Sequence, residues 1–279
     1  MPDTAHPFET ARVRTLPALK VELAALRAGG ATIGFVPTMG ALHDGHLALV
    51  RHAKSLCDKV VVSIFVNPLQ FAPTEDLDRY PRDEAGDIAR LQSVGCDLVY
   101  LPTVDVLYPK NFVSRIEMNG PAIGLETDFR PQFFSGVATV VSKLFNQVRP
   151  DVAVFGEKDF QQLAVVRALV RDFDMGIDVV GMPTVREADG LALSSRNAYL
   201  TPEERAIAPK LYQTLEAIRD GAEIEQAKID LQGAGFGQID YIALRDADTL
   251  GEITPETKSR RLLAALWLGK TRLIDNLAV

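Results

Sequence analysis

Short strand-like and helix-like segments alternate along residues 32–185, and this alternation constrains the fold more than any other feature of the sequence. Apolar runs of strand length are predicted at 32–36, 59–66, 97–101, 152–156 and 178–185. Helical segments are predicted between them at 46–57, 84–94, 137–148 and 160–173. Strands that alternate with helices of this length form βαβ units with right-handed crossovers. We therefore expect an α/β fold built on a parallel sheet.

The pattern changes after about residue 186, where the stretch EADGLALSSRNAYL shows little periodicity. Thr201 then offers an N-cap, and Pro202 suits the first turn of a helix. The remaining elements are predicted as helices at about 202–219 and 222–233 and strands at 239–245 and 261–269. Two helices followed by strands predict a smaller α+β C-terminal domain. We therefore divide the chain into domains 1–185 and 186–279.

Composition and charge exclude several classes of protein. The chain has 279 residues, of which 47% are hydrophobic, and a net charge of −7, which disfavours a surface that binds nucleic acid. No apolar stretch approaches the roughly 20 residues of a membrane-spanning helix, and the segment MPDTAHPFETARVR lacks the apolar run of a signal peptide. Cys57 and Cys96 are far apart and are read as reduced thiols. We expect a cytoplasmic protein with no membrane or nucleic-acid partner.

The stretch PTMGALHDGHLALV, residues 37–50, lies where the first of these strands passes into a helix. Ligands of open parallel sheets bind at the carboxyl ends of strands, where a helix N-terminus offers free N–H groups to an anion. Gly40 and Gly45 let the backbone approach a phosphate, and His43 and His46 can donate hydrogen bonds to it. The alternative is a capped turn with surface histidines. A zinc site is disfavoured because no third ligand lies nearby.

The stretch FGEKDFQQL, residues 155–163, follows another predicted strand. Lys158 is a compact cation of the kind that pairs with nucleotide phosphates. Asp159 is a candidate helix cap or metal ligand. An ordinary charged turn between strand and helix is the alternative interpretation.

A third stretch, DGLALSSRN at 189–197, places Ser194, Ser195 and Arg196 side by side. Two hydroxyls and a guanidinium suit a mobile loop that closes over a polyphosphate. A flexible linker between domains explains the same residues. In SIFVNPLQF, residues 63–71, Gln70 lies just past a strand end, and Gln162 follows Lys158 by four residues. Amide side chains can bind the hydroxyl and carboxylate groups of a ligand through hydrogen bonds. Glutamines are, however, more often surface residues without a ligand.

Taken together, these stretches carry a resemblance over residues 32–277. PTMGALHDGH, FVNPLQF, YPR, FGEKDFQQL, GLALSSRN and WLGKTRLIDN occur in the order of the signature set of the pantoate–β-alanine ligases. These enzymes belong to the HxGH nucleotidylyltransferase superfamily. The resemblance implies a Rossmann-like N-terminal domain and a reaction in two steps. Pantoate attacks the α-phosphorus of ATP to give pantoyl adenylate, and β-alanine then displaces AMP to give pantothenate.

The resemblance also implies roles for individual residues. It assigns catalytic roles to His43, His46, Lys158 and Arg196, and substrate binding to Gln70 and Gln162, with β-alanine near Gln70. It places in the ATP site Pro37, Thr38, Met39, Gly40, His43, Gly45, His46, Gly156, Lys158, Asp159, Val185, Leu193, Ser194, Ser195 and Arg196. Mg²⁺ is implied by ATP chemistry, held mostly by phosphate oxygens and water rather than by a protein metal site. A homodimer formed through the N-terminal domain is also implied, and Asp87 is a candidate supporting acid.

Two segments depart from the family pattern. Phe133–Phe134–Ser135–Gly136 stands where relatives carry a polar His-Phe-Arg-Gly type of turn, and Gly86 thins the acidic pair expected after YPR. Other functions remain open on the same fold: an adenylyltransferase that makes a dinucleotide, a synthetase-like fragment that charges tRNA, or a non-catalytic ATP sensor. The acidic net charge disfavours tRNA, and a sensor is expected to have lost a phosphate-handling residue, whereas this chain has kept them all.

Overall fold

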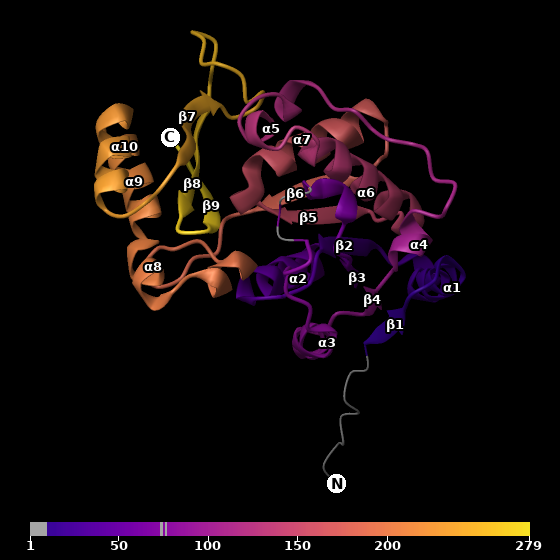
Figure 1. Cartoon of the computed structure of the whole chain (residues 1–279). Coiled ribbons are helices and arrows are strands. Elements are labelled where there is room, and N and C mark those ends of the chain that lie inside the picture. The colour runs from indigo at the N-terminus through magenta and orange to yellow at the C-terminus, as the bar shows by residue number, and fades with distance from the viewer. Residues whose placement is uncertain (1–9, 73–74, 76) are drawn as a thin grey trace.

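A six-stranded parallel sheet organises the first part of the chain in the computed structural model, which describes residues 10–72, 75 and 77–279 (Figure 1). Its strands, in spatial order, are β1 (Ala11–Val13), β4 (Leu98–Tyr100), β3 (Lys59–Ile64), β2 (Ile33–Thr38), β5 (Val152–Gly156) and β6 (Asp178–Met182). The chain therefore continues from β2 to its neighbour β3 on one side and later enters β5 on the other. Such a reversal of strand order opens a crevice at the carboxyl ends of the strands.

Helices cover both faces of this sheet, as expected when both faces of a parallel sheet are buried. One face is covered by α1 (Leu16–Leu26), α6 (Phe133–Val148) and α7 (Phe160–Asp172). The other face is covered by α2 (Asp44–Leu56) and α3 (Glu84–Ser93). Alternate residues of each strand supply the two cores: Phe35 and Val61 face the first set of helices, whereas Val36 and Val62 face the second.

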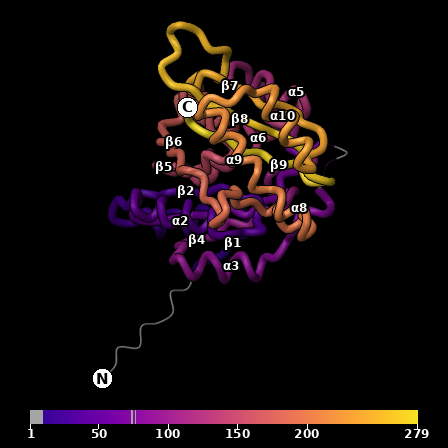
Figure 2. Tube along the Cα trace, turned by 90° about the vertical axis from the view of Figure 1, so that its left-hand side faces the viewer, coloured from indigo at the N-terminus to yellow at the C-terminus, as the bar shows by residue number. Residues whose placement is uncertain are grey.

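The C-terminal part forms a second layered unit beside the first. Its elements are α8 (Pro202–Ile207), α9 (Lys210–Arg219), α10 (Ile224–Gly233) and the antiparallel strands β7 (Ile239–Asp246), β8 (Arg260–Leu268) and β9 (Thr271–Ala278). In the side view, α9 and α10 lie in front of the three strands (Figure 2). Leu211, Leu215 and Leu231 of these helices pack on Leu262 and Leu266 of β8.

The opposite face of the antiparallel sheet contacts the first part of the chain. Leu263 of β8 packs with Leu125 and Phe160, and Tyr241 and Ala243 of β7 lie against the same cluster. The antiparallel sheet is thus buried between its own helices and the parallel-sheet part. Short helices α4 (Val104–Leu107) and α5 (Glu126–Phe129) and the 3₁₀ turns complete the chain.

Several element boundaries differ from the sequence predictions. The predicted helix 202–219 is wrong as one element, because Pro209 has no N–H to continue the ladder and separates α8 from α9. The helix predicted from 137 begins at Phe133, and the strand predicted to 185 ends at Met182. Strand β9 and the β1–α1 segment were not predicted.

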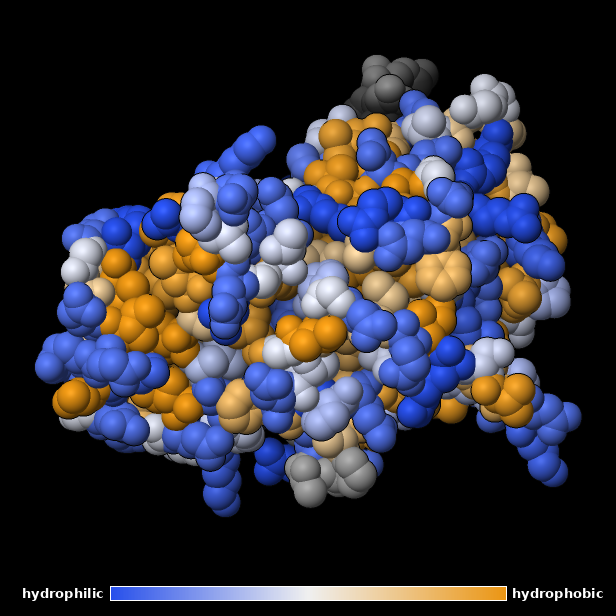
Figure 3. All heavy atoms as spheres, turned by 90° about the horizontal axis from the view of Figure 1, so that it is seen from above, coloured by the Kyte–Doolittle hydropathy of each residue, from blue (hydrophilic) through white to orange (hydrophobic). Residues whose placement is uncertain are grey.

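The surface seen from above mixes hydrophilic and hydrophobic side chains over both parts of the molecule (Figure 3). Over the described part of the molecule as a whole, the large exposed hydrophobic residues come from many elements; they include Val21, Ile123, Phe173 and Ile229. Within residues 10–72, 75 and 77–279, no helix is both long and apolar enough to cross a membrane.

Gly136 in the first turn of α6 lets this helix contact the 3₁₀ turn at Pro68–Gln70. A Cβ atom at position 136 would lie 2.2 Å from the carbonyl oxygen of Leu69 and 2.8 Å from the amide nitrogen of Gln70. The Gly136 carbonyl also accepts a hydrogen bond from Asn67 Nδ2 at 3.2 Å. Gly136 is therefore required by the approach of two backbones.

Gly136→Ala should lower the free energy of unfolding by at least about 2 kcal/mol, because the backbone of residues 69–70 must move to admit the methyl group. Urea unfolding of the purified variant measures this change. Gly233→Ala in α10 is the matched control: its Cβ meets no atom within 4 Å, so it should raise stability by about 0.5–1 kcal/mol. A Gly136→Ala variant as stable as the control would contradict the argument.

Candidate active site

One large cavity, of about 880 Å³, lies at the carboxyl ends of β2 and β5 and reaches the antiparallel sheet. Of the residues singled out in the sequence, those that line this cavity are Pro37, Thr38, Met39, His43, Gly45, His46, Gln70, Gly156, Lys158, Asp159, Gln162, Val185, Leu193, Ser194, Ser195 and Arg196. Gly40 lies in the same loop but not on the cavity wall. The fold therefore brings together motifs that are separated by up to about 160 positions in the sequence.

Gly45 leaves room for the His43 imidazole, so both histidine rings can lie side by side. His43 is the N-cap of α2, and His46 lies in its first turn. A Cβ atom at Gly45 would lie 2.9 Å from Cε1 and 3.0 Å from Nδ1 of His43, so a side chain there would displace the imidazole. With glycine in place, the rings of His43 and His46 lie 4.1 Å apart, centroid to centroid, on the cavity wall.

The charge state of the two imidazoles follows from their surroundings. Burial, the neighbouring His43 and Lys158 lower the pKa of His46 to about 3. Burial and Lys158 lower the pKa of His43 to about 4. Both rings are therefore neutral at pH 7. His46 Nδ1 accepts the His43 backbone N–H at 3.3 Å, which assigns its ring proton to Nε2 and makes Nε2 a donor.

Asp87 holds the loop that carries these histidines. Its buried carboxylate accepts the backbone N–H groups of Ala41 at 2.9 Å and Leu42 at 2.7 Å. The loop needs this restraint because Gly40 and Ala41 both have positive φ, at 83° and 51°. A side chain on Gly40 would also meet Asp87 Oδ2 at 3.0 Å. Burial raises the pKa of Asp87, and the two N–H donors oppose that rise.

The turn at Glu157–Asp159 follows β5 directly and leads into α7. Lys158 lines the cavity and makes no ion pair with any residue that the structure describes. Asp159 is the N-cap residue of α7, but its side chain makes no capping hydrogen bond, so the capping role considered for it is wrong. Gln161 is buried and donates to backbone carbonyls, and both Gln161 and Gln162 line the cavity.

The segment 185–199 folds as a small hairpin followed by a 3₁₀ turn. The Leu193 N–H donates to the Val185 carbonyl at 3.0 Å, which brings the two predicted ATP-site residues together. The Ser194 hydroxyl then caps the turn by accepting the Arg196 N–H at 3.3 Å. Ser195 Oγ lies 3.3 Å from the Tyr80 hydroxyl of the YPR stretch. This segment is thus held against the residue that opens YPR.

Gln70 lies in a polar cluster at another part of the cavity wall. Its Nε2 lies 3.1 Å from the sulfur of Met39, and its Oε1 accepts from Asn67 Nδ2 at 3.0 Å. Asn67 is in turn fixed by the Tyr108 hydroxyl at 2.8 Å. The aromatic residue Phe133, where relatives were expected to carry a histidine, also lines the cavity.

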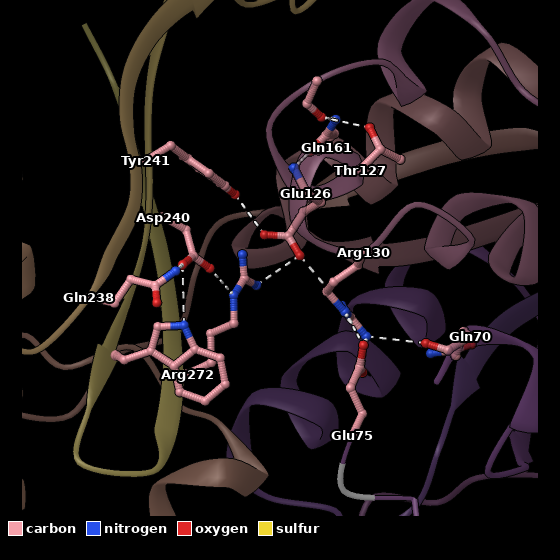
Figure 4. Close-up of polar contacts among 12 residues, drawn as sticks. Gln70, Glu75, Glu126, Thr127, Arg130, Gln161, Gln238, Asp240, Tyr241 and Arg272 are labelled. Atoms are coloured by element: carbon pink, nitrogen blue, oxygen red, sulfur yellow. Dashed lines mark hydrogen bonds and ion pairs between the residues drawn. The ribbon is translucent and has the colours of Figure 1, made fainter. Parts of the chain in front are cut away.

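An ionic cluster centred on Glu126 was missed by the sequence analysis (Figure 4). Glu126 is 5% exposed and accepts Arg272 Nη1 at 2.8 Å and the Tyr241 hydroxyl at 2.7 Å, both from the antiparallel sheet. Arg272 Nε also donates to Asp240 at 2.7 Å. Burial acts to raise the pKa of Glu126, but Arg272, Tyr241 and Arg130 outweigh it, and the pKa is lowered. Glu126 is therefore an anion that joins the two parts of the chain.

Arg130 extends this cluster to the Gln70 region. Its Nη2 donates to the Gln70 carbonyl at 3.2 Å and to Glu75 at 2.6 Å, and its Nη1 lies 3.4 Å from Glu126. The guanidinium also stacks 3.7 Å from the ring centroid of Phe133. Figure 4 shows the resulting chain of contacts from the antiparallel sheet to the glutamine.

The parallel sheet and this cavity define a class: an α/β protein with an HxGH motif at its switch point. The family model described as pantoate-beta-alanine ligase matches residues 11–278. The chain therefore belongs to the pantoate–β-alanine ligase family and is an enzyme of pantothenate biosynthesis.

Individual relatives agree with this assignment. A pantothenate synthetase of a Bradyrhizobium species (strain BTAi1) is 54% identical over 95% of this chain and 97% of its own length. The crystal structure of the enzyme from Thermus thermophilus has a TM-score of 0.87 at 46% identity, covering 96% of this chain and 99% of that one. A Francisella tularensis pantoate-β-alanine ligase, solved with β-γ ATP and β-alanine, has a TM-score of 0.83 at 36% identity, covering 97% and 98%.

The lowered pKa of His43 predicts a pH-dependent stability. Unfolding restores the ordinary value of 6.5, so between pH 6.5 and about 4 the unfolded chain binds a proton that the folded chain does not. The free energy of unfolding should therefore fall as the pH falls through this window. His43→Gln should fall less steeply between pH 7 and about 4.5 in urea titrations. Equal slopes for the wild type and His43→Gln would refute the prediction.

Removal of the Glu126 charge should destabilise the protein, because Glu126 is the shared ionic partner of Arg130 and Arg272. Glu126→Gln should lower the free energy of unfolding by about 3 kcal/mol, because Arg272 and Arg130 lose their shared counter-ion in a largely buried site. Glu225→Gln removes an exposed partner of Lys228 and should cost less than about 1 kcal/mol. Chemical unfolding of both variants measures the contrast, and an equal cost would argue against the buried role.

Proposed function

We propose that this enzyme joins pantoate to β-alanine in two steps within the cavity described above. A pantoate carboxylate oxygen attacks the α-phosphorus of ATP, and pyrophosphate leaves. The β-alanine nitrogen then attacks the carbonyl carbon of pantoyl adenylate, AMP leaves with the carboxylate oxygen, and the nitrogen loses a proton. The first step is needed because a free carboxylate is a poor acyl donor, whereas AMP is a good leaving group.

The observation that carries this proposal is the distribution of side chains around the cavity. Neutral N–H donors and a cation, His43, His46 and Lys158, lie at the switch point between β2 and β5. Gln70 and Gln162 offer amides on the same cavity wall. Such a site can hold a polyphosphate beside a small hydroxy acid, and in-line attack depends mainly on positioning and charge stabilisation.

We assign the phosphate contacts to His43, His46, Lys158 and Arg196. Neutral histidines act here as hydrogen-bond donors, and their low pKa values preserve this form at pH 7. Lys158 and Arg196 neutralise the charge that develops on the departing pyrophosphate. Ser194 and Ser195, with the hairpin of Val185 and Leu193, close over the nucleotide. Pantoate binds through both glutamines, with β-alanine near Gln70.

Mg²⁺ fits this site as a companion of the nucleotide. Among residues 10–72, 75 and 77–279, no cluster of three or more histidine, cysteine or acidic side chains could hold a metal ion. We assign the ion mainly to phosphate oxygens and water, which Mg²⁺ usually keeps as ligands. Asp159 lines the cavity without capping α7, and its carboxylate would be the protein's contribution. The ion would supply charge stabilisation on the pyrophosphate.

The remaining assignments rest on the family. We place the enzyme in the cytoplasm as a homodimer joined through its N-terminal domain. Residues 1–185 would form the domain that binds ATP and pantoate, and 186–279 a smaller lid. The Francisella ligase was solved as a complex with β-γ ATP and β-alanine, which supports binding of both kinds of molecule by this enzyme.

Exchange of labelled pyrophosphate into ATP tests the first step without β-alanine. Exchange should require pantoate, because the label enters ATP only when labelled pyrophosphate attacks pantoyl adenylate and releases pantoate, the reverse of adenylate formation. His46→Ala should keep its fold, judged by circular dichroism, and slow exchange by at least about 100-fold, the scale for loss of one transition-state donor. His52→Ala should exchange at the wild-type rate. Pantoate-independent or absent exchange by a protein that binds ATP would redirect the assignment to another acceptor or to a sensor.

A further inference from the structure

The tail stretch WLGKTRLIDN belongs to the motif set, yet the proposed mechanism gives it no role. Its last residue, Asn276, lies in β9 and is 2% exposed. The side-chain nitrogen Nδ2 donates to two backbone carbonyls of the parallel-sheet part, Glu157 at 2.9 Å and Lys158 at 2.8 Å. These carbonyls belong to the 3₁₀ turn that presents Lys158 to the cavity.

The orientation of the Asn276 amide is fixed by Arg261. Arg261 Nε donates to Asn276 Oδ1 at 2.6 Å, and since a guanidinium cannot accept, the other end of the amide must face the two carbonyls. Arg261 also contacts the same turn, with Nη2 at 3.2 Å from Glu157 Oε2 and its guanidinium 4.1 Å from the ring centroid of Phe160. Arg261 thus holds the oxygen of the Asn276 amide, and the nitrogen of the amide holds the turn at Glu157–Asp159.

The residue before it, Asp275, restrains a second phosphate-site segment. Its two oxygens accept Arg186 Nη1 at 2.6 Å and Nη2 at 2.9 Å. Arg186 pairs with Ala192 in the hairpin that leads to Ser194. Through Arg186, Asp275 is therefore connected to the loop that is proposed to close over the nucleotide. Two successive residues of β9 contact both polyphosphate-binding segments.

We propose that Asn276 is a positioning residue for Lys158. By bonding both carbonyls of the turn, it sets the peptide planes around Lys158 and aims the ammonium at the phosphates. This proposal rests on the proposed role of Lys158 in ATP binding, but not on the identity of the acid substrate.

Asn276→Asp tests the proposal with minimal change in shape, because the carboxylate keeps an acceptor for Arg261 and loses both donors. ATP binding by calorimetry, without pantoate or β-alanine, should weaken about 10-fold or more, and pantoate-dependent exchange should slow by up to about 100-fold, as expected for a displaced cation. Adenosine, which has no phosphate, should bind within about twofold of wild type if the cavity is intact.

A double-mutant cycle separates positioning from general damage. In a Lys158→Ala background, Asn276→Asp should weaken ATP binding by less than about twofold further, because the group it acts through is gone. Full additivity, or a normal ATP affinity for Asn276→Asp, would overturn the proposal. Equal weakening of adenosine and ATP would do the same.

Two controls keep the result interpretable. Leu277→Ala alters the next residue of β9, which packs on the helical side, and should lower stability while leaving ATP affinity unchanged. Asn276→Ala, which adds no charge, replaces the Asp variant should that protein fail to fold. Wild-type protein that binds ATP but shows no pantoate-dependent exchange would refute the substrate assignment alone. Wild-type protein that binds no ATP would refute both proposals.

Discussion

The position of β2 between β3 and β5 is the constraint on which the rest of the structure depends. Since all three strands run in parallel, their carboxyl ends meet at one edge, and the segments that follow them leave toward opposite sides. The loop at Met39–His43 and the turn at Glu157–Asp159 therefore flank one crevice. No local preference of either stretch would produce this arrangement; it follows from strand order.

Under the proposed function, this crevice suits phosphate chemistry because two of its donors, the imidazoles of His43 and His46, are uncharged and fixed. Burial keeps both histidines neutral, so each offers an N–H without the cost of a buried cation. Asp87 contributes by holding the loop, because its carboxylate accepts the backbone N–H groups of Ala41 and Leu42. Electrostatic stabilisation of a transition state depends on such groups being in place before reaction. Both the positive φ angles of the loop and the buried Asp87 carboxylate help to hold the two histidines in position.

Local patterns predicted the parallel sheet and the residues that follow its strands, because short apolar runs and turn residues are recognised from neighbouring positions. The same reasoning, together with the family resemblance, named site residues of which all but Gly40 line the cavity. It missed β9 and the cluster around Glu126, whose partner Arg272 lies 146 positions away. A glutamate at the start of a four-residue helix gives no signal of such a contact. Pro209 did give a signal, and the long helix across it was an avoidable error.

The contacts of β9 bear on how the C-terminal part acts. Arg272 reaches the Gln70 region through Glu126 and Arg130, whereas Asn276, four residues later on the same strand, contacts the Lys158 turn. A rigid strand fixes the distance between these two points. Any displacement of the antiparallel sheet would therefore move the contacts of Gln70, proposed to bind pantoate, and of Lys158, proposed to bind phosphate, together. A lid that only excluded water would need neither the Arg272–Glu126 contact nor the Asn276–Lys158 contact. The antiparallel sheet therefore supports the cavity wall both near Gln70 and near Lys158.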